Sequence, residues 1–478
     1  MSVAVSSSAP PKTQAVSNSR WVWLIVAVGI GAIIAALPTP HGLSHIAQLV
    51  LAVTAFTVVL WAAQVMNSGV ASVLLMALLI VIGVPVPRVF SGFGGGAFWT
   101  LLTVLFYGFA MKKTGLAERL SYYILSMFPG TYGGILTSFF IIGFVLALGI
   151  PSMTVRTAIM TPVAWALVQS LGLPPKSRGS ALIILTTVEM AVVPGIAFLY
   201  GSLTGPVVVA AFEAKKLPIT WLGYAQVLTF PTLVLCALIL VGNQFLLRPE
   251  APLNASPTFA RDRLRALGSF KGPEAVTGLV VLFSIVFWTT DRYHHLPAFL
   301  IGMVAMAIFY MAGILRDEDI GTGVSWTLLL FIGGIFSLAN IIQDYKVTDW
   351  IAGYIVPMVR QIEFSVVILC IAMAIAMYAL RFIDPSSFIA VTVLFLSTVS
   401  LTMAAGIPPL VLMAPIILAS APFWVAYQNF WLAMAEGLTG NQAFLAGHRV
   451  RLANAYAIFC LVALVVSVGY WRLIGVLH

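Results

Sequence analysis

The stretch WVWLIVAVGIGAIIAAL, residues 21–37, carries no charged side chain over its whole length. Runs of comparable length follow along the chain, among them residues 275–290 and 452–468. Each is long enough for a helix that crosses a hydrocarbon core about 30 Å thick. Because apolar and polar residues do not alternate within the runs, they do not indicate strands of a membrane barrel. The sequence therefore predicts an all-α polytopic membrane protein.

Composition supports the same fold class. Of 478 residues, 61% are hydrophobic and only 8% are charged, which is too apolar for an ordinary soluble domain. The net charge of +9 does not indicate a nucleic-acid partner, because most basic residues sit in loops between apolar runs. The three cysteines, Cys236, Cys370 and Cys460, lie inside such runs, so we expect neither a disulfide framework nor a metal cluster, and no cofactor.

The first 20 residues are polar and rich in Ser, Ala and Pro, which is typical of a disordered tail. A cleaved signal peptide is the alternative, but the first apolar run lies far from Met1 and no small-residue cleavage site follows it. More of the 24 Lys and Arg residues fall in loops on the side of this tail than on the other side. We therefore predict a cytoplasmic N-terminus in a bacterial inner membrane.

A polar connection at residues 248–271 divides the apolar sequence into two similar parts. Pro151-Ser152 recurs 234 positions later as Pro385-Ser386, and the Gly-Leu-Pro-Pro at 172–175 recurs at the same offset as Gly-Ile-Pro-Pro. We expect two inverted repeats, an arrangement common in secondary transporters. The predicted organisation is a tail (1–20), a first transmembrane helix and loop (21–44), a first repeat (45–248), a cytoplasmic connector (249–274) and a second repeat (275–478).

Each repeat contains an interrupted apolar stretch. In the first, Gly149 and Pro151 stand two residues apart, and in the second the equivalent interruption is residues 383–387. Pro lacks an N–H group and disfavours a helical residue before it, so backbone groups are freed that need partners in hydrocarbon. Two re-entrant hairpins with tips at a polar cavity meet this need. An ordinary Pro kink in a packed helix is the alternative.

A second pair of interruptions follows each hairpin, at residues 194–206 and 436–441. Leu203-Thr204-Gly205 matches Leu438-Thr439-Gly440 at an offset of 235, which suggests that these segments are equivalent. Their small and hydroxyl residues allow a ligand to approach the backbone closely. Small residues are also favoured where transmembrane helices pack, and that alternative stays open.

These motifs resemble the divalent-anion/sodium symporter family, which includes dicarboxylate, citrate and sulfate transporters. The similarity runs from about Ala52 to the C-terminus and includes the amphipathic segment 111–119. By this resemblance, Ser152-Met153-Thr154 and Ser386-Ser387-Phe388 occupy the family's two Ser-Asn-Thr tips, and Gly440-Asn441 occupies a Pro-Asn position. The resemblance implies a homodimer with about eleven crossings plus two re-entrant hairpins, and a transport domain that moves against a scaffold domain.

The sequence departs from the family pattern at both tips. Met153 and Ser387 replace the two asparagines, and Phe388 replaces the second threonine. An asparagine supplies both an acceptor and a donor, so contacts to cation and anion are lost. Sodium coupling and dicarboxylate preference do not follow from the resemblance alone, and a proton is the alternative coupling ion.

Several charged residues lie at membrane depth, where charge commonly marks function. Arg156 follows the first tip, and its guanidinium fork suits a carboxylate or sulfate; pairing with Glu189 or snorkelling is the alternative. Asp384 stands three residues after Arg381, either as a structural pair or as a cation ligand or proton carrier. Glu189 and Glu436 lie beside the second interruptions. We expect them to form packing or gating pairs rather than to couple transport to an ion.

We therefore predict a secondary active transporter for a small anion of the di- or tricarboxylate or sulfate type, coupled to Na+ or H+ by an elevator-type mechanism. A related permease for a neutral or non-carboxylate solute is the main alternative. The chain lacks the common motifs of membrane enzymes, so we do not expect an enzyme, and paired tips suit alternating access better than a channel. The predicted substrate-binding residues are Ser152, Met153, Thr154, Arg156, Ser386, Ser387, Thr204, Thr439 and Asn441. The predicted cation-binding residues are Gly149, Ser152, Asp384, Gly205 and Gly440.

Overall fold

A computed structural model describes residues 18–253, 258–347, 350, 365–382, 387–425 and 428–477. Helices make up most of this part of the chain, and it contains no β-strand. Within it, seven helices are long and apolar enough to cross a membrane, and shorter apolar helices accompany them. The prediction of an all-α polytopic fold is confirmed. The number of crossings stays a prediction.

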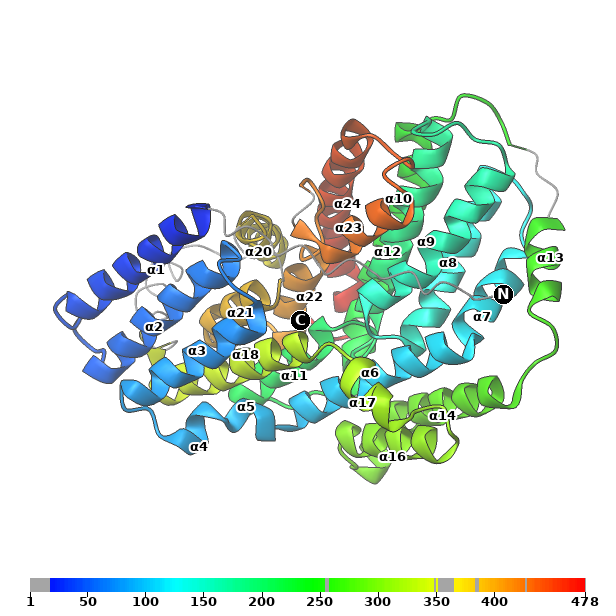
Figure 1. The fold of residues 1–478 in the computed structure, drawn as a ribbon. Coiled ribbons are helices and arrows are strands. Elements are labelled where there is room, and N and C mark those ends of the chain that lie inside the picture. Colours follow the sequence, from blue (N-terminus) through cyan, green and yellow to red (C-terminus); the bar gives the residue numbers. More distant parts are fainter. Residues whose placement is uncertain are drawn as a thin grey trace.

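The N-terminal helices form one end of the molecule, at the left of Figure 1. There α1 packs on α2, α2 on α3, and α3 on α18, which comes from the second half of the chain. Large side chains of α1 remain exposed, including Trp21 and Ile25, as expected for a helix that faces lipid. This end comprises α1 (Asn18–Ala36), α2 (His45–Ala62), α3 (Ser68–Val81), α4 (Val86–Val89), α5 (Ser91–Gly94) and α18 (Trp326–Asp344).

The lower edge in Figure 1 is built around one long helix, α6 (Gly96–Thr114), on which α14 and α16 pack. Gly115 ends α6 with φ +85°, a left-handed conformation that favours glycine, and the chain turns into the amphipathic α7 (Leu116–Leu125). The other helices here are α14 (Gly272–Thr289), α15 (Asp291–His294), α16 (Ala298–Met311) and α17 (Asp317–Thr322).

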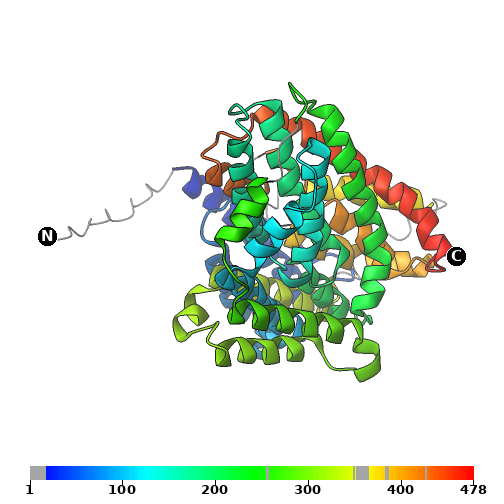
Figure 2. The ribbon, with the colours of Figure 1, turned by 90° about the vertical axis from the view of Figure 1, so that its right-hand side faces the viewer.

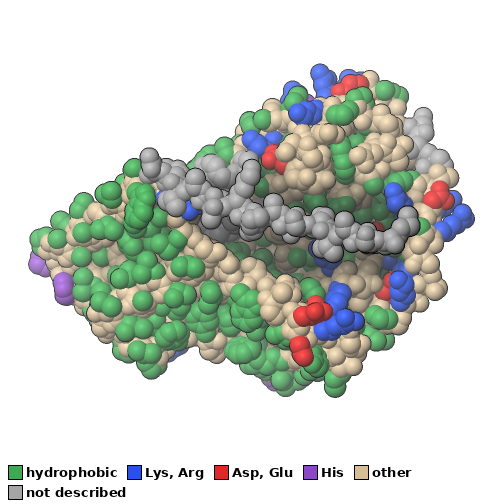
Figure 3. Space-filling model, in the orientation of Figure 1, with side chains coloured by type: hydrophobic (Ala, Val, Ile, Leu, Met, Phe, Trp, Pro, Cys, Tyr) green, Lys and Arg blue, Asp and Glu red, His purple; other side chains and the backbone are tan. Residues whose placement is uncertain are grey.

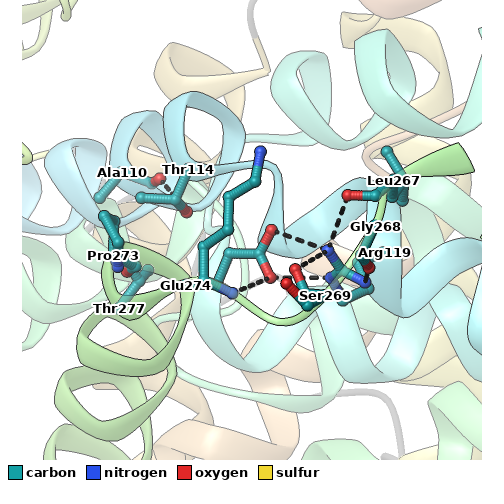
Figure 4. A network of polar contacts seen from close by, with 10 residues as sticks. Ala110, Thr114, Arg119, Leu267, Gly268, Ser269, Pro273, Glu274 and Thr277 are labelled. Carbon is teal, nitrogen blue, oxygen red and sulfur yellow. Dashed lines mark hydrogen bonds and ion pairs between the residues drawn. The ribbon is translucent and has the colours of Figure 1, made fainter.

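Arg119 of α7 fastens the end of the connector to this edge (Figure 4). Its Nε donates to Glu274 Oε2 over 2.7 Å, and its guanidinium also donates to the carbonyls of Leu267, Gly268 and Ser269. Arg119 and Glu274 are both largely buried, so the pair is shielded from salt. The short α13 (Thr258–Ala266) of the connector packs on α7 next to this network.

Two sets of broken helices fill the rest of the molecule, and they follow the same order. The first set is α8 (Tyr132–Gly149), α9 (Met153–Ser170), α10 (Arg178–Val192) with the 3₁₀ turn η1 (Val193–Ala197), α11 (Thr204–Ala214) and α12 (Trp221–Leu246). The second set is α20 (Val366–Leu380), α21 (Phe388–Ala404), α22 (Pro409–Leu418), α23 (Phe430–Leu438) and α24 (Ala446–Leu473). The last helices of the two sets, α12 and α24, pack on each other (Figure 2).

The surface separates into apolar and charged parts. Hydrophobic side chains cover much of the left-hand lobe in Figure 3, whereas Lys, Arg, Asp and Glu gather toward the upper and right-hand edges. Exposed apolar residues of the N-terminal lobe include Ile33, Val70 and Val73. An apolar surface of this extent suits contact with lipid rather than water.

Candidate functional site

The first helix break lies between α8 and α9, as the sequence predicts. Ile150 takes an extended conformation (φ −125°, ψ 93°), which the following Pro151 favours, and Pro151 has no N–H group to continue the helix. The Ser152 hydroxyl then accepts a hydrogen bond from the Val155 N–H over 3.3 Å and caps α9. The break is therefore dictated by local sequence.

Gly149 is required by packing at this break. A Cβ atom on Gly149 would lie 2.7 Å from Met111 Sδ and 2.9 Å from Val281 Cγ1. The structure thus assigns Gly149 a close helix contact, and its predicted role in cation binding stays a prediction.

Of the second break, which precedes α21 (Phe388–Ala404), the structure describes only the last residue, Ser387. Ser387 has φ +66°, a left-handed conformation that is uncommon for residues other than glycine, and α21 begins directly after it. Such backbone strain is often found at binding sites. Asp384 and Ser386, two predicted site residues, lie outside the described residues.

A cavity of about 1170 Å³ brings the two breaks together. Ser152, Met153 and Thr154 line it from the first break, and Ser387 and Phe388 from the second. Residues of α1, α2, α3, α6, α17, α18 and α23, and of the segments before α3, α11, α18 and α23, complete the lining. They include Arg20, Trp61, Asn67, Leu105, Phe109, Leu203, Thr322, Ser325, Phe331, Ser420, Asn429 and Trp431. The first break and the described end of the second break thus line one cavity, and its role in substrate binding stays a prediction.

Four helices of the two broken sets begin at this cavity, and α3 and α18 begin there as well. Met153 and Phe388 are the first residues of α9 and α21 and line it, as do Leu203 and Asn429, which directly precede α11 and α23. A helix N-terminus offers N–H groups without intrahelical partners and the positive end of the helix dipole. These N-termini contribute positive potential to the part of the wall that they form, while the last turns of α6 and α17 line another part.

The charged side chains that line the cavity are all basic among the described residues: Arg20, Lys112 and Lys113. Lys113 forms an ion pair with Asp319 of α17, which stands beside the cavity without lining it. The hydrogen bond from Lys113 holds the pKa of Asp319 below its ordinary value. Lys113 is therefore partly neutralised, whereas Lys112 lies exposed at the cavity.

Arg156, a predicted substrate ligand, does not line the cavity. It is fully buried behind the first break, where its guanidinium donates to the carbonyls of Ala191 (2.6 Å), Gly201 (2.6 Å), Val192 (3.4 Å) and Ile150. Within the part of the chain that the structure describes, it forms no ion pair with an acidic residue, and it does not reach the surface. Arg156 supplies donors to carbonyls that the interrupted helices leave without partners.

Close backbone approach explains the glycines after α10. A Cβ on Gly195 would lie 2.3 Å from an Arg156 nitrogen and 2.3 Å from the Gly201 carbonyl oxygen. At Gly205 it would lie 1.5 Å from the Leu199 carbonyl oxygen. Gly205 and the buried Thr204, whose hydroxyl bonds to Ser202, lie just behind the cavity wall formed by Leu203.

The second interruption of the second set lies earlier in the chain than the sequence match suggests. Thr204 is the first residue of α11, but Thr439 directly follows the last residue of α23. The Thr439 hydroxyl bonds to Ala435 of its own helix, and Gly440 and Asn441 are exposed beyond it, off the cavity. Ser420, Ala421 and Asn429, which lie between α22 and α23, line the cavity instead. A match as short as Leu-Thr-Gly in an apolar sequence does not determine which positions of the two helix sets are equivalent.

Both glutamates next to the predicted interruptions make structural contacts. Glu189 is buried, and its Oε2 accepts a hydrogen bond from Asn243 over 2.6 Å. Glu436 forms an ion pair with Arg449 at 3.2 Å. These contacts agree with the expectation that the two residues form packing pairs.

Asn429 and Arg381 form a part of the site that the sequence did not single out for binding. Asn429 lines the cavity, and its Oδ1 accepts a hydrogen bond from Arg381 over 2.9 Å. Arg381 is buried and also donates to the Gln428 carbonyl. The available signal was Gln428-Asn429 itself, a polar pair between aromatic residues in an apolar stretch.

Comparison with known proteins identifies the family. A family model described as "Sodium:sulfate symporter transmembrane region" matches residues 18–477. This chain belongs to that family. The sodium:sulfate symporter family consists of transporters, which confirms the predicted class and excludes an enzyme.

Similar symporter-family proteins include "Dicarboxylate transporter 1, chloroplastic" of Spinacia oleracea, 22% identical over 83% of this chain and 71% of that protein. "Inner membrane protein YbhI" of Escherichia coli is 23% identical over 70% of this chain and 73% of that protein. Among solved structures, the YdaH transporter of Alcanivorax borkumensis has a TM-score of 0.56 at 12% identity, covering 96% of this chain and 98% of that one. At that identity the likeness concerns the fold alone.

Proposed function

We propose that this symporter-family member transports a small dicarboxylate, tricarboxylate or sulfate ion across the plasma membrane, coupled to sodium. The observation that carries the proposal is the cavity where four helix N-termini meet Arg20, Lys112 and Lys113. Basic side chains and helix N-termini around one space of about 1170 Å³ support binding of an anion. The dicarboxylate transporter named among its relatives supports an organic anion.

In the proposed site, the hydroxyl groups of Ser152, Thr154 and Ser387 and the N–H groups that begin α9 and α21 bind the anion. Met153 and Phe388 form the apolar part of the wall. Arg156 supports the first break from behind. The proposed site does not include Thr439, Gly440 or Asn441, and Thr204 and Gly205 contribute through the shape of the wall.

Sodium is proposed as the coupling ion because the family takes its name from it. Its proposed ligands are oxygen atoms near the first break, around Gly149 and Ser152, together with Asp384 from the second. Coupling follows if the empty and the fully loaded site can cross the membrane, whereas a half-loaded site cannot, because an isolated charge at membrane depth is expensive.

The repeated order of the two helix sets supports an inverted repeat and an elevator-type motion of the broken helices against the rest. The proposed assembly is a homodimer with its N-termini in the cytoplasm. The excess of basic residues on that side supports this orientation.

The test is uptake of labelled succinate, citrate and sulfate into proteoliposomes, with a sodium or a proton gradient imposed in separate runs. Protein-free liposomes provide the background. We expect sodium-driven uptake of at least one anion. Uptake driven only by a proton gradient would replace sodium as the coupling ion. If none of the three anions moves while the protein stays monodisperse, the proposal fails and a neutral or non-carboxylate solute becomes the leading candidate.

A further inference from the structure

Asn429 stands where an asparagine ordinarily caps its own helix, but it does not do so. It is the residue before α23, with extended backbone (φ −146°, ψ 121°), and its side chain makes no capping hydrogen bond. An asparagine at this position ordinarily accepts a hydrogen bond from the first turn of the helix. Here the side-chain oxygen turns to Arg381 instead, so the first N–H groups of α23 are not used by it.

The orientation of the Asn429 amide is determined by its two partners. Arginine can only donate, so the atom 2.9 Å from the Arg381 guanidinium is Oδ1. The carbonyl of Pro422 can only accept, so the atom bonded to it is Nδ2. One amide hydrogen then remains on Nδ2, and the residue that carries it lines the cavity.

Arg381 is placed to hold this amide rather than to bind ligand itself. Its side chain is buried, with 1% of its surface exposed, and it is not part of the cavity lining. Besides Asn429, it donates to the carbonyl of Gln428, so it holds Asn429 together with the residue before it. A planar guanidinium with a fixed fork does this better than a lysine ammonium.

We propose that Asn429 is a substrate ligand that donates its remaining amide N–H to an oxygen of the transported anion, and that Arg381 is the positioning residue that aims it. This inference rests on the proposed function and names one specific contact within it. It also supplies an amide donor in a site where Met153 and Ser387 stand in place of the two family asparagines.

The experiment measures KM and maximal rate of anion uptake, together with the rise in unfolding temperature caused by the same anion. Asn429→Asp keeps the size and the acceptor facing Arg381 but removes the amide donor and adds negative charge. We expect its KM to rise at least tenfold and the anion-induced stabilisation to disappear. Arg381→Lys should raise KM about three- to tenfold with the maximal rate within twofold of wild type, because the amide is still present but less well held.

Two further variants keep the result interpretable. Asn454→Asp makes the same chemical change at an exposed asparagine whose Oδ1 accepts from Trp424 and which does not line the cavity, and its KM should stay at the wild-type value. In the double variant Asn429→Asp/Arg381→Lys, KM should rise no further than in Asn429→Asp alone, since positioning has no effect once the donor is gone.

The outcomes separate this proposal from the proposed function. If wild type takes up an anion but Asn429→Asp has unchanged KM and unchanged stabilisation, the assignment of Asn429 is wrong and the function stands. The positioning role is wrong if Arg381→Lys only lowers the folded yield and the remaining protein has wild-type KM. If wild-type protein neither takes up nor is stabilised by any of the three anions, both proposals fail together.

Discussion

The two arginines beside the helix breaks are both buried, but their guanidinium groups have different partners. Arg156 follows the first break and donates to four backbone carbonyls behind the cavity. Arg381 precedes the second break and holds Asn429, a side chain that lines the cavity. A buried guanidinium can therefore complete interrupted backbone or orient a binding residue, and its partners decide which. Substitution of Arg156 should therefore mainly affect folding, whereas substitution of Arg381 should mainly affect transport.

The largest effect is expected for Arg156→Met. The change leaves the carbonyls of Ala191, Val192, Gly201 and Ile150 without this donor, and each unpaired buried group costs about 1–3 kcal/mol. We expect little or no monodisperse protein by size-exclusion chromatography in detergent. Arg381→Met should give more folded protein than Arg156→Met. A well-folded Arg156→Met protein with a raised KM would instead make Arg156 a substrate ligand.

Gly195→Ala tests the space around the first arginine without removing it. The added methyl group would overlap an Arg156 nitrogen and the Gly201 carbonyl oxygen, each 2.3 Å away, so the guanidinium must shift. We expect the unfolding temperature to fall by about 1–3 °C, in line with about 1–3 kcal/mol for overpacking in a chain of 478 residues. Gly437→Ala, where a methyl group meets no atom within 4 Å, is the matched control. Equal stability of both variants would contradict the close packing.

Ser152→Ala should affect transport more than stability. The hydroxyl lines the cavity and caps α9, so its loss removes one ligand contact and one cap. A hydrogen bond worth about 1 kcal/mol corresponds to roughly a fivefold rise in KM, and loss of the cap lowers the unfolding temperature slightly. Ser387→Gly is the corresponding variant at the second break. Glycine adopts the left-handed conformation of Ser387 without strain, so stability should be unchanged or higher. Unchanged KM in both variants would remove the breaks from the binding site.

The smallest effect is expected outside the breaks, for Asp319→Asn. Removing the carboxylate frees the charge of Lys113 at the cavity, so KM for a divalent anion should fall about two- to threefold at low ionic strength and return to the wild-type value in high salt. Lys113→Gln should shift KM in the opposite direction. If both variants shift KM the same way, the pair acts through structure rather than charge.

The same ion pair makes a prediction about pH. Because the pKa of Asp319 is lowered in the folded protein, its contribution to stability is present above the ordinary carboxyl range and is lost as pH falls through the lowered pKa. Between about pH 8 and pH 5 the pair should therefore stay intact. The ratio of wild-type to Asp319→Asn KM should be constant over this range.

Much of the fold could be read from the sequence because hydrophobic length and Pro151 act locally. The apolar runs at 21–37, 275–290 and 452–468 correspond to α1, α14 and α24, and the first break falls where Pro151 requires it. The later interruptions, at residues 194–206 and 436–441, were matched by aligning two long apolar stretches. Short matches carry little information in such stretches. Thr439 was therefore aligned with Thr204 although the two residues lie at opposite ends of their helices.

The site was less predictable than the fold because its specific contacts are tertiary. The sequence marked Arg156 as important because it lies in an apolar run. Its carbonyl partners come from α10, the loop after η1 and Ile150 at the first break, and no sequence pattern shows how these meet. Asn429 was missed for the same reason, since its role depends on Arg381, which lies 48 positions earlier in the chain.

The positive potential at the four helix N-termini of the broken sets comes from the peptide backbone. Substitution of a single side chain therefore neither creates nor removes it. A lineage with this backbone is free to change the residues at its tips, as Met153 and Ser387 illustrate, while the pocket continues to favour anions. Attraction for negative charge would then be the conserved property, and the choice among anions the variable one. Substrate range in such proteins should follow the side chains of the cavity wall, whereas the sign of the substrate charge should follow the fold.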